Sequence, residues 1–536
     1  MSEADKHVKR LGQLKGARAV HEDVWRRCFD MAFPLLGDGF AGQRTTADEA
    51  RAKLADRRDS TATDSGEVLA ANIVGGLTPS SSLWFGLDAG QESEDERAWL
   101  DNASRVVWEN IHASNYNAAA FECSLYIVAA GWFVKYIEEA EGGGYDFESW
   151  PIGQCYTTST RRDGVVDTIF RTYSRSVAQC AATYGENNLS PRTAKLFAEN
   201  KLDAQVELLH VIEPRAIHAV NAVTAKALPF KSCTYEVQDK HLLRESGYHE
   251  FPCVVPRWNV IPGTSYAVGP MFKALPDIEQ LNRLVAMEDM AAELAVAGMW
   301  IAEDDGVLNP RAVKVGPRRI IVANSVDSMK PLMTGADFNV SFTKKAELQM
   351  QIRRALMADQ MQPLGNAADR PDMTLGEVHA RMALTRQVLG PMYGRLESEW
   401  LQRLIERCFG LALRAGALGQ PPESLMGRDF TIRYLSPMAR SQKLEDVSGM
   451  QAHEADLMVQ AQQKPEILDT YAWDEAQRYK AELRGVPSRF IVPKKDTDAI
   501  RDARAEQMAQ AQQAEQAAMT QQTLTGAAAQ RMAAVA

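Results

Sequence analysis

The sequence predicts a mainly helical α+β protein, and three features carry that prediction. Between residues 132 and 261 lie short runs rich in β-branched and aromatic residues, separated by turn residues. From Pro276 onward, helical spacing of the apolar residues returns for most of the chain. The N-terminal quarter has the same three- and four-residue spacing at residues 17–33, 64–77, 97–114 and 117–131. Because helical and strand-like stretches are segregated along the chain, an α+β class is expected.

The composition sets the scale of the molecule and restricts its partners. A chain of 536 residues exceeds one ordinary hydrophobic core, so we expect three or more structural units. The net charge of −10 argues against a protein that binds nucleic acid through its whole surface. DNA that must slide past a protein should meet few cations, because each phosphate contact adds affinity by counterion release.

The seven cysteines and the apolar runs indicate the cellular setting. The cysteines are odd in number and scattered, with no C-x-x-C spacing, so reduced thiols and synthesis in the cytoplasm are expected. The N-terminus lacks an apolar segment behind a basic start, so no secretory signal is predicted. The longest apolar runs, 123–134 and 294–302, are shorter than the roughly 20 residues that span a bilayer. No membrane association is expected.

The first half of the chain divides at Trp132. The helix at 17–33 stops before Pro34, and residues 35–60 are predicted to form a loop. After Trp132, two β-rich runs around three glycines at 142–144 predict a hairpin. Further strands are expected at 165–174, 205–214, 233–238, 241–250 and 251–261, with short helices at 175–185 and 190–201.

The second half contains two long helical patterns that bracket a small β-rich insert. The first opens at Pro276, since proline fits the first turn of a helix, and the second ends near residue 361. A polar loop follows and ends at Thr374, whose spacing to Glu377 is that of a capping box. A helix over 375–414 is expected next, kinked where Pro391 removes a hydrogen bond. The chain continues with a strand at 429–435, a helical block at 441–484 and an Ala/Gln-rich end.

The motifs of enzymes are absent from the sequence. No G-x-x-x-x-G-K-[ST] loop is present, which argues against an enzyme that works as an ATP-driven motor. No Cys/His cluster or H-E-x-x-H motif supports a metal site, and no G-x-S-x-G motif supports a nucleophile. We therefore predict no catalytic residues, no metal and no cofactor.

Two groups of basic residues remain as candidates for binding. In the insert between Gly306 and Gly335, five cations face one acidic residue, which suggests docking of an acidic partner or a DNA backbone. A second group lies on the following helix and loop. Basic residues on an exposed surface are also common without any partner. The insert cations are Arg311, Lys314, Arg318, Arg319 and Lys330, and the second group is Lys344, Lys345, Arg353, Arg354 and Arg370.

The stretch 251–284 resembles the head-to-tail connector, or portal, family of short-tailed bacteriophages (podoviruses). It carries Pro256-Arg257-Trp258, then Tyr266-Ala267-Val268-Gly269-Pro270, then Ala274-Leu275-Pro276-Asp277-Ile278, in the order of the family's strand, turn and helix. Ala267 departs from the family's glycine, which bears on the local backbone because glycine alone takes positive φ freely. The resemblance covers roughly residues 15–435 and includes the similar segments 71–87 and 114–139.

This resemblance implies a ring of identical subunits, twelve in number, at one vertex of the capsid. Double-stranded DNA would pass through its axis during packaging and ejection, without sequence-specific contacts. The implied partners are the terminase packaging motor, tail adaptor or nozzle proteins, and the major capsid and scaffolding proteins. The protein would be made in the host bacterial cytoplasm and reside in the virion. The alternative within the same particle is another structural protein: a tail adaptor, a tube or an internal ejection protein.

The resemblance also divides the chain and assigns roles to its basic residues. Asn366, Asp369 and Arg370 would face the DNA channel, together with Lys344, Lys345, Arg353 and Arg354, and the five insert cations would dock the motor or the tail adaptor. The implied parts are a wing (1–268), a first stem helix (269–300), a clip (301–340), a second stem helix (341–361), a channel loop (362–373), a long kinked helix with a wing strand (374–436), a crown (437–510) and a tail (511–536).

Overall fold

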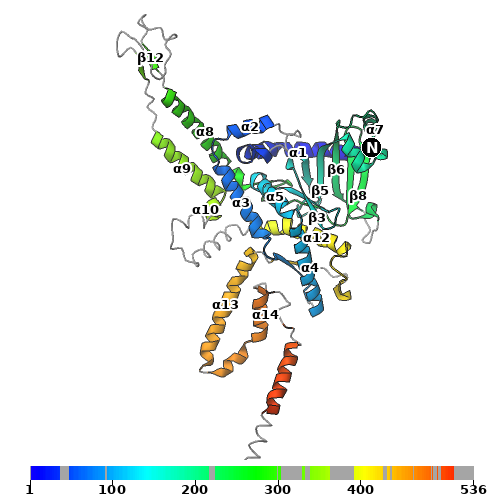
Figure 1. Cartoon of the computed structure of the whole chain (residues 1–536), viewed down its shortest axis with the longest axis vertical. Helices are drawn as coiled ribbons and strands as arrows, with labels where there is room; N and C mark the ends of the chain where they lie inside the picture. The colour runs from blue at the N-terminus through cyan, green and yellow to red at the C-terminus, as the bar shows by residue number, and fades with distance from the viewer. Residues whose placement is uncertain are drawn as a thin grey trace, which may run out of the picture. The chain divides into compact units, whose positions relative to one another are not determined.

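The computed structural model describes most of the chain, arranged in two compact units. Unit 1 comprises residues 1–84 and 105–419, and unit 2 comprises residues 85–104 and 420–536. The described residues are 2–36, 47–90, 93–216, 224–297, 300–302, 329–331, 338–361, 392–425, 431–434, 437–462, 464–483, 486, 492 and 496–511. Helices and strands segregate as predicted, so the mainly helical α+β class is confirmed (Figure 1).

The largest sheet of unit 1 is a five-stranded antiparallel sheet. Its strand order, β4-β5-β6-β7-β8, follows the sequence, so each strand pairs with the next along the chain. A β-bulge interrupts the pairing of the last two strands at Thr234 and Tyr235. The strands are β4 (Cys155–Thr158), β5 (Thr168–Ser176), β6 (Gln205–Pro214), β7 (Phe230–Glu236) and β8 (His241–Tyr248). The predicted strands at 165–174, 205–214, 233–238 and 241–250 are therefore confirmed.

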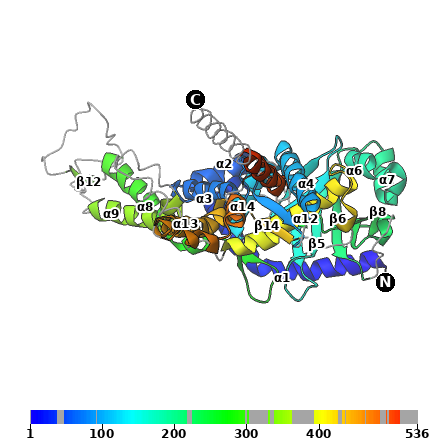
Figure 2. The ribbon, with the colours of Figure 1, turned by 90° about the horizontal axis from the view of Figure 1, so that it is seen from below.

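Helices cover both faces of this sheet, and the alternation of side chains explains how. Leu209 of β6 joins a cluster with Leu11 and Leu14 of α1 (Glu3–Ala32) on one face. Its neighbour Leu208 points the other way, as successive strand residues must, and packs with Cys180 of α6 (Val177–Tyr184). Figure 2 shows α1 on one side of the sheet and α6 with α7 (Pro191–Ala198) on the other.

The predicted hairpin is also confirmed. β2 (Val134–Glu139) and β3 (Tyr145–Trp150) pair antiparallel, and β9 (Cys253–Val254) adds a third strand beside β2. The turn contains Gly143 and Gly144 at φ +88°, which glycine adopts without strain. The Trp150 ring lies 5.8 Å from the ring of His210, which is on the same face of the large sheet as Leu208. The hairpin and α1 therefore pack on opposite faces of the sheet.

Two elements near the N-terminus differ in extent from the sequence-based expectation. The first helix begins at Glu3, where Ser2 and Asp5 form a reciprocal capping box. Within the region predicted as a loop, residues 35–60, the structure has a helix, α2 (Ala47–Asp56). Its sequence, ADEARAKLAD, consists of helix-favouring residues without glycine or proline, so local propensity accounts for the difference. α3 (Thr61–Leu77) and α5 (Tyr116–Ala130) follow the prediction.

The helix predicted to open at Pro276 begins earlier. α8 (Pro270–Ala297) starts at another proline, and Pro276 lies inside it. Pro270 satisfies the first-turn preference equally well, because its missing N–H would be unpaired there. Pro276 is exposed, so the carbonyl that loses its helical donor lies on the water-facing side of the helix.

The described part of the predicted 375–414 helix contains an irregular turn. Residues 392–396 are α-helical, Glu397–Leu401 form a π-helical turn, and α12 (Gln402–Arg414) continues the element. The predicted stripe is buried at Leu396, Trp400 and Leu404. The expected kink at Pro391 lies outside the described residues.

Unit 2 combines a small strand pair with helices. β1 (Phe85–Asp88) pairs with β14 (Thr431–Tyr434), which confirms the predicted strand at 429–435. The helical block predicted at 441–484 is divided by a 3-10 turn, Pro465–Thr470, because proline breaks the hydrogen-bond ladder. Unit 2 also holds the first half of α4 (Glu94–Ala113), α13 (Pro437–Ala461), α14 (Trp473–Leu483) and a helix over 496–511.

Two predictions from composition concern the whole chain. All seven cysteines are free and buried. Burial raises the pKa of the Cys155 thiol to about 12, so at neutral pH this thiol is protonated and unreactive. No helix within the described ranges is long and apolar enough to span a membrane.

Candidate functional site on the paired helices α8 and α9

The predicted channel residues centre on two helices that lie side by side. α9 (Phe338–Ala355) packs against α8, as both ribbon views show (Figures 1 and 2). Leu348 and Ile352 of α9 are buried four residues apart, and Leu281 and Val285 of α8 show the same spacing. This spacing puts one apolar stripe on each helix, and the opposite faces remain exposed.

Glu288 of α8 holds α9 in place. Its carboxylate accepts hydrogen bonds from the Ser341 hydroxyl at 2.5 Å and from the Lys345 ammonium at 3.3 Å. Lys344 pairs within its own helix, with Glu347 at 3.0 Å. Two of the four predicted channel cations on this helix therefore have carboxylate partners within the subunit.

The other two cations, Arg353 and Arg354, are exposed at the end of α9. Neither side chain has a hydrogen-bond or ion-pair partner among the residues that the structure describes. After α9 the backbone turns at Met357, whose φ is +59°, and a short helix, α10 (Ala358–Met361), follows. Within the described chain, the guanidinium groups of Arg353 and Arg354 are thus available to bind an anion.

Most of the other predicted site residues lie outside the described residues. Lys330 is in β13 (Met329–Pro331), opposite Ile301 of β12 (Trp300–Ala302). β12 lies near the start of the predicted insert and β13 near its end, and the two strands pair antiparallel. The residues outside the described ranges are Asn366, Asp369 and Arg370 of the predicted channel loop, and Arg311, Lys314, Arg318 and Arg319 of the insert. Their roles stay predictions.

Polar contacts tie the helix pair to the segment before α3. Arg58 donates to Asp289 of α8 at 3.1 Å, and Gln349 of α9 donates to Asp59 at 2.8 Å. Burial acts to raise the pKa of Asp59, but hydrogen bonds from Thr61 and Gln349 outweigh it, so the pKa is lowered. Asp59 is therefore a charged acceptor that holds both α9 and the start of α3.

The Pro-Arg-Trp motif at 256–258 contains a buried ion pair. The Arg257 guanidinium donates two hydrogen bonds to the Glu399 carboxylate, at 2.6 and 3.0 Å, with both side chains at most 7% exposed. Glu399 belongs to the π-helical turn, so this pair attaches the 392–414 helix to the core of unit 1. The Pro-Arg-Trp motif by itself does not indicate a partner for Arg257. The available signal was Glu399 itself, an acidic residue beside Trp400 on an apolar stripe.

The neighbouring turn explains why alanine is tolerated at position 267. Ala267 lies in β11 (Ala267–Val268), without a positive φ, and its carbonyl accepts a hydrogen bond from Trp25 at 3.1 Å. The substitution of the family's glycine therefore incurs no backbone penalty here. Glycine is required instead at Gly131, where φ is +87° and a Cβ atom would overlap the backbone of Val268.

Lys135 is a buried lysine near the same π-helical turn. Its ammonium has no hydrogen-bond partner among the described residues and lies over the rings of Tyr116 at 4.3 Å, Trp400 at 5.3 Å and Phe133 at 5.7 Å. Burial lowers its pKa to about 8. Cation–π attraction stabilises the charged form but does not replace the lost hydration.

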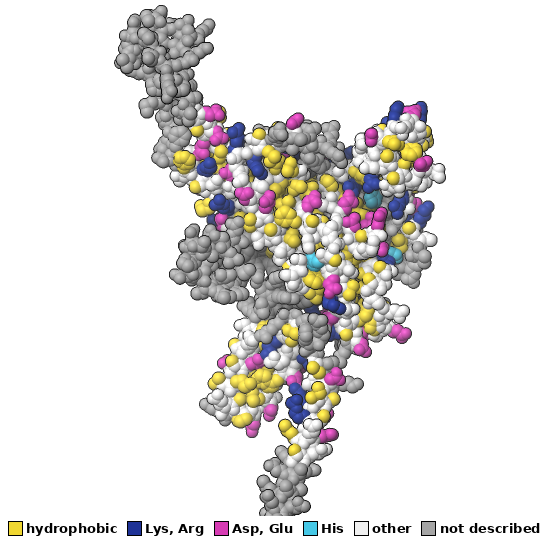
Figure 3. All heavy atoms as spheres, in the orientation of Figure 1, with side chains coloured by type: hydrophobic (Ala, Val, Ile, Leu, Met, Phe, Trp, Pro, Cys, Tyr) yellow, Lys and Arg dark blue, Asp and Glu magenta, His cyan; other side chains and the backbone are white. Residues whose placement is uncertain are grey.

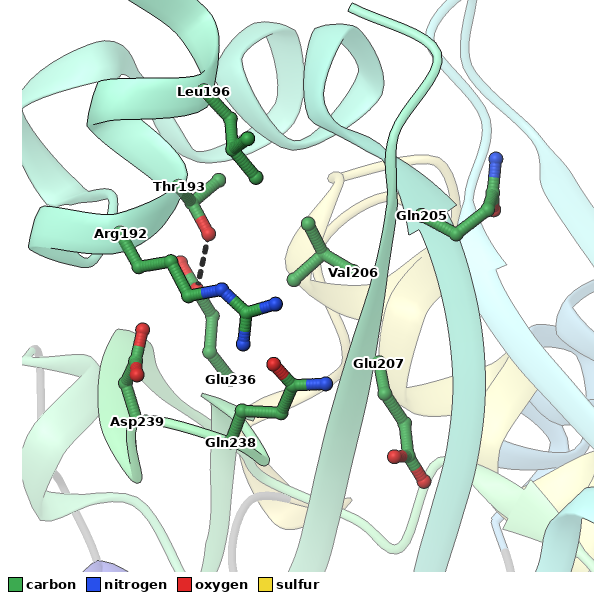
Figure 4. Close-up of a pocket in the computed structure, with 9 residues that line it drawn as sticks. All are labelled: Arg192, Thr193, Leu196, Gln205, Val206, Glu207, Glu236, Gln238 and Asp239. Carbon is green, nitrogen blue, oxygen red and sulfur yellow. Dashed lines mark hydrogen bonds between the residues drawn. The ribbon is translucent and has the colours of Figure 1, made fainter. Parts of the chain in front are cut away.

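A small polar pocket lies between α7 and the sheet (Figure 4). Its buried carboxylate, Glu236, accepts hydrogen bonds from the hydroxyls of Thr193 at 2.6 Å and Ser190 at 2.7 Å. These residues form the first turn of α7, where a carboxylate also satisfies the helix N-terminus. The pocket thus anchors α7 to the sheet.

One group of side chains has the spacing of metal ligands. The ligand atoms of Glu3, His7 and Glu213 lie within 4.8 Å of one another. Each already has a partner: Lys231 pairs with Glu3, and His7 contacts Tyr235 at 3.0 Å and Glu213 at 3.1 Å. The neighbouring ammonium of Lys231 also repels a cation. This arrangement is an ion-pair network between α1 and the sheet.

Side chains of both charges are interspersed over the described part of the face in Figure 3. This pattern agrees with the modest net charge of −10 for a chain of this length. Comparison with known proteins gives the class: the sequence model for bacteriophage head to tail connecting proteins matches residues 4–492.

The chain belongs to the bacteriophage head to tail connecting protein family, which confirms the resemblance noted in the sequence. It is 27% identical over 525 residues to the probable portal protein of Bordetella phage BPP-1, covering 94% of this chain and 92% of that protein. It is 28% identical over 524 residues to the portal protein of Salmonella phage epsilon15, covering 95% of this chain and 93% of that protein. The protein is thus a portal-type, head-to-tail connecting component of a phage particle.

A solved structure titled as the neck of an empty GTA particle, computed with C6 symmetry, is also similar. The two chains are 13% identical, the match covers 77% of this chain and 88% of the chain in that structure, and the TM-score is 0.33. At that score the likeness supports no structural argument.

Proposed function

We propose that twelve copies of this chain form a ring at one vertex of the capsid, through which double-stranded DNA is packaged and ejected. The observation that carries this proposal is the family match over residues 4–492. Copies that contact one another head to tail close into a ring when the rotation between neighbours divides a full turn. Such a ring would hold a continuous axial opening.

In this proposal, the paired helices form the stem of the ring. α8 and α9 correspond to the stem helices, residues 301–340 to the clip and residues 362–373 to the channel loop, with the wing (1–268, 374–436), crown (437–510) and tail (511–536) around them. The clip would dock the terminase packaging motor and the tail adaptor or nozzle proteins through its five cations. The wing and crown would meet the major capsid and scaffolding proteins.

Contact with DNA would be sparse and independent of sequence. Arg353 and Arg354 support this part of the proposal, because their guanidinium groups are exposed and unpaired within the described chain. Lys344 and Lys345 would contribute less, since carboxylates of the same subunit already neutralise them. Few unpaired cations per subunit would guide the duplex without holding it.

Electron microscopy of the purified full-length protein tests the proposal. We expect a ring with twelve-fold symmetry and an axial opening wide enough for B-DNA. A protein that stays monomeric under assembly conditions, or rings whose opening excludes a duplex in every state, would refute it.

We further propose that the protein has no catalytic activity, needs no cofactor, and passes from the host bacterial cytoplasm into the virion. The purified ring should therefore not hydrolyse ATP, which a phosphate-release assay measures directly. ATP turnover by the pure protein would instead revive the motor alternative.

A further inference from the structure

The exposed part of the first half of α1 carries unopposed positive charge. The acidic residues in this half already have partners: Glu3 pairs with Lys231 of β7, and Asp5 pairs with Lys240 in the turn between β7 and β8. Four exposed cations in this half have no ion-pair partner among the described residues. They are Lys6, Lys9, Arg10 and Lys15, all exposed, and we call them the α1 patch.

The tip of the β2–β3 hairpin carries the opposite charge. Lys135, a cation in this hairpin, is fully buried and points away from solvent. Four exposed carboxylates occupy the tip, and none of them forms an ion pair within the described chain. They are Glu138, Glu139, Glu141 and Asp146, which we call the hairpin patch.

The two patches lie on opposite layers of unit 1. α1 packs on one face of the five-stranded sheet through Leu11 and Leu14, and its patch lies on the exposed part of that helix. The hairpin packs on the other face, where Glu148 pairs with Arg171 at 3.1 Å beside His210. Within one subunit, the α1 patch therefore cannot contact the hairpin patch. Two copies in the same orientation, side by side, present one patch to the other.

We propose that the α1 patch of one subunit docks against the hairpin patch of the next subunit, forming a repeated contact of the ring. The proposal rests on the proposed ring and specifies one of its interfaces. The partner is a second copy of this chain, because the two patches are opposite in sign and equal in number of charges. A contact between different patches of identical copies is heterologous, which is the kind that closes rings.

The size of the expected effect follows from exposed ion pairs. Each contributes modestly to binding, but reversing one side converts attraction into repulsion. Reversal of one patch should therefore raise the protein concentration needed for half-maximal assembly by about tenfold or more. Salt should weaken assembly of the unmodified protein, because a Debye length of about 8 Å at physiological ionic strength screens such contacts.

The test uses two full-length variants that each reverse one patch. The first carries K6E, K9E, R10E and K15E, and the second carries E138K, E139K and E141K. We expect each variant alone to assemble poorly, because like charges then meet at every contact. Mixed in equal amounts, they should form rings, because each reversed patch then meets an oppositely charged patch on the other variant. Analytical ultracentrifugation measures assembly, and native mass spectrometry shows the composition of the mixed rings.

A matched control reverses exposed lysines elsewhere in unit 1. K195E with K201E changes charge on and after α7, outside both patches, and should assemble as the unmodified protein does. If a patch variant assembles normally alone, or if the mixture fails to recover, the docking proposal is wrong while the ring stands. A monomeric unmodified protein would refute the ring itself. Should the lysine variant of the hairpin misfold, E138Q with E139Q and E141Q removes the same charge and should weaken assembly.

Discussion

Lys135 shows what a buried charge costs when no hydrogen bond compensates for lost water. Its ammonium is surrounded by the rings of Tyr116, Phe133 and Trp400 and is completely buried. Burial lowers its pKa from 10.5 to about 8, so at neutral pH the folded protein still carries an unfavourable charge in its core. Lys135 therefore reduces stability near neutral pH.

Lys135→Met should stabilise the protein by about 1–3 kcal/mol at pH 7, since methionine fills an aromatic pocket without charge. Between pH 8 and 10.5, Lys135 is protonated in the unfolded chain but largely neutral in the folded protein. The free energy of unfolding of the unmodified protein therefore increases as the pH rises through this window. The difference in stability between Lys135→Met and the unmodified protein should become smaller over the same range. Thermal unfolding from pH 7 to 10.5 measures both effects.

The control for this prediction is Lys195→Met, because the Lys195 side chain is 78% exposed. It should change the midpoint of unfolding little, and its difference from the unmodified protein should not vary with pH. An equal response of both variants would show that the effect does not come from the buried ammonium.

Removing one partner of the ion pair between Arg257 and Glu399 should destabilise the protein, whereas removing the Lys135 ammonium should stabilise it. Glu399→Ala strands a buried guanidinium and should cost about 3–5 kcal/mol, measured by denaturant unfolding. The double variant Arg257→Met with Glu399→Leu removes both charges and should recover most of that loss. A double variant as unstable as Glu399→Ala would mean that packing, and not the stranded charge, dominates.

At the scale of elements, the sequence predicted strands and turns correctly where neighbouring residues determine them. Strand alternation placed β6 at 205–214 with the same bounds as the structure, and the three glycines predicted the β2–β3 turn. The helix start predicted at Pro276 was wrong, because Pro270 satisfies the same first-turn preference six residues earlier. The π-helical turn at Glu397–Leu401 has no signature in residue spacing.

Gly131 allows a close approach between two elements that are far apart in sequence. Gly131→Ala should destabilise the protein by about 2–6 kcal/mol, because the new Cβ would overlap the backbone of Val268 at a φ that disfavours alanine. Soluble yield and the thermal midpoint measure the effect. Gly142→Ala is the matched control: a Cβ there has open space, so its midpoint should be close to that of the unmodified protein. Equal stability of the two variants would contradict the packing argument.

At the scale of the whole molecule, the sequence predicted the family better than it predicted which cations have ion-pair partners. Lys344 and Lys345 were grouped with Arg353 and Arg354 because all four share one helix. Lys345 is neutralised by Glu288, 57 positions earlier in the chain, and only tertiary packing brings them together. Among the described residues, the candidate site therefore consists of Arg353 and Arg354, whose side chains have no ion-pair partner there.

Arg353→Glu with Arg354→Glu should lower the yield of DNA-filled particles by about tenfold or more, because each ring would then present acidic groups to the phosphate backbone. The DNA content of purified particles measures this effect, and microscopy checks that the rings still form. Lys344→Glu should have a smaller effect, since that ammonium already has a carboxylate partner. The charge-matched control, K195E with K201E, should leave packaging unchanged. Full genome content in the arginine variant would remove Arg353 and Arg354 from the channel and leave the contact with DNA to residues beyond α9.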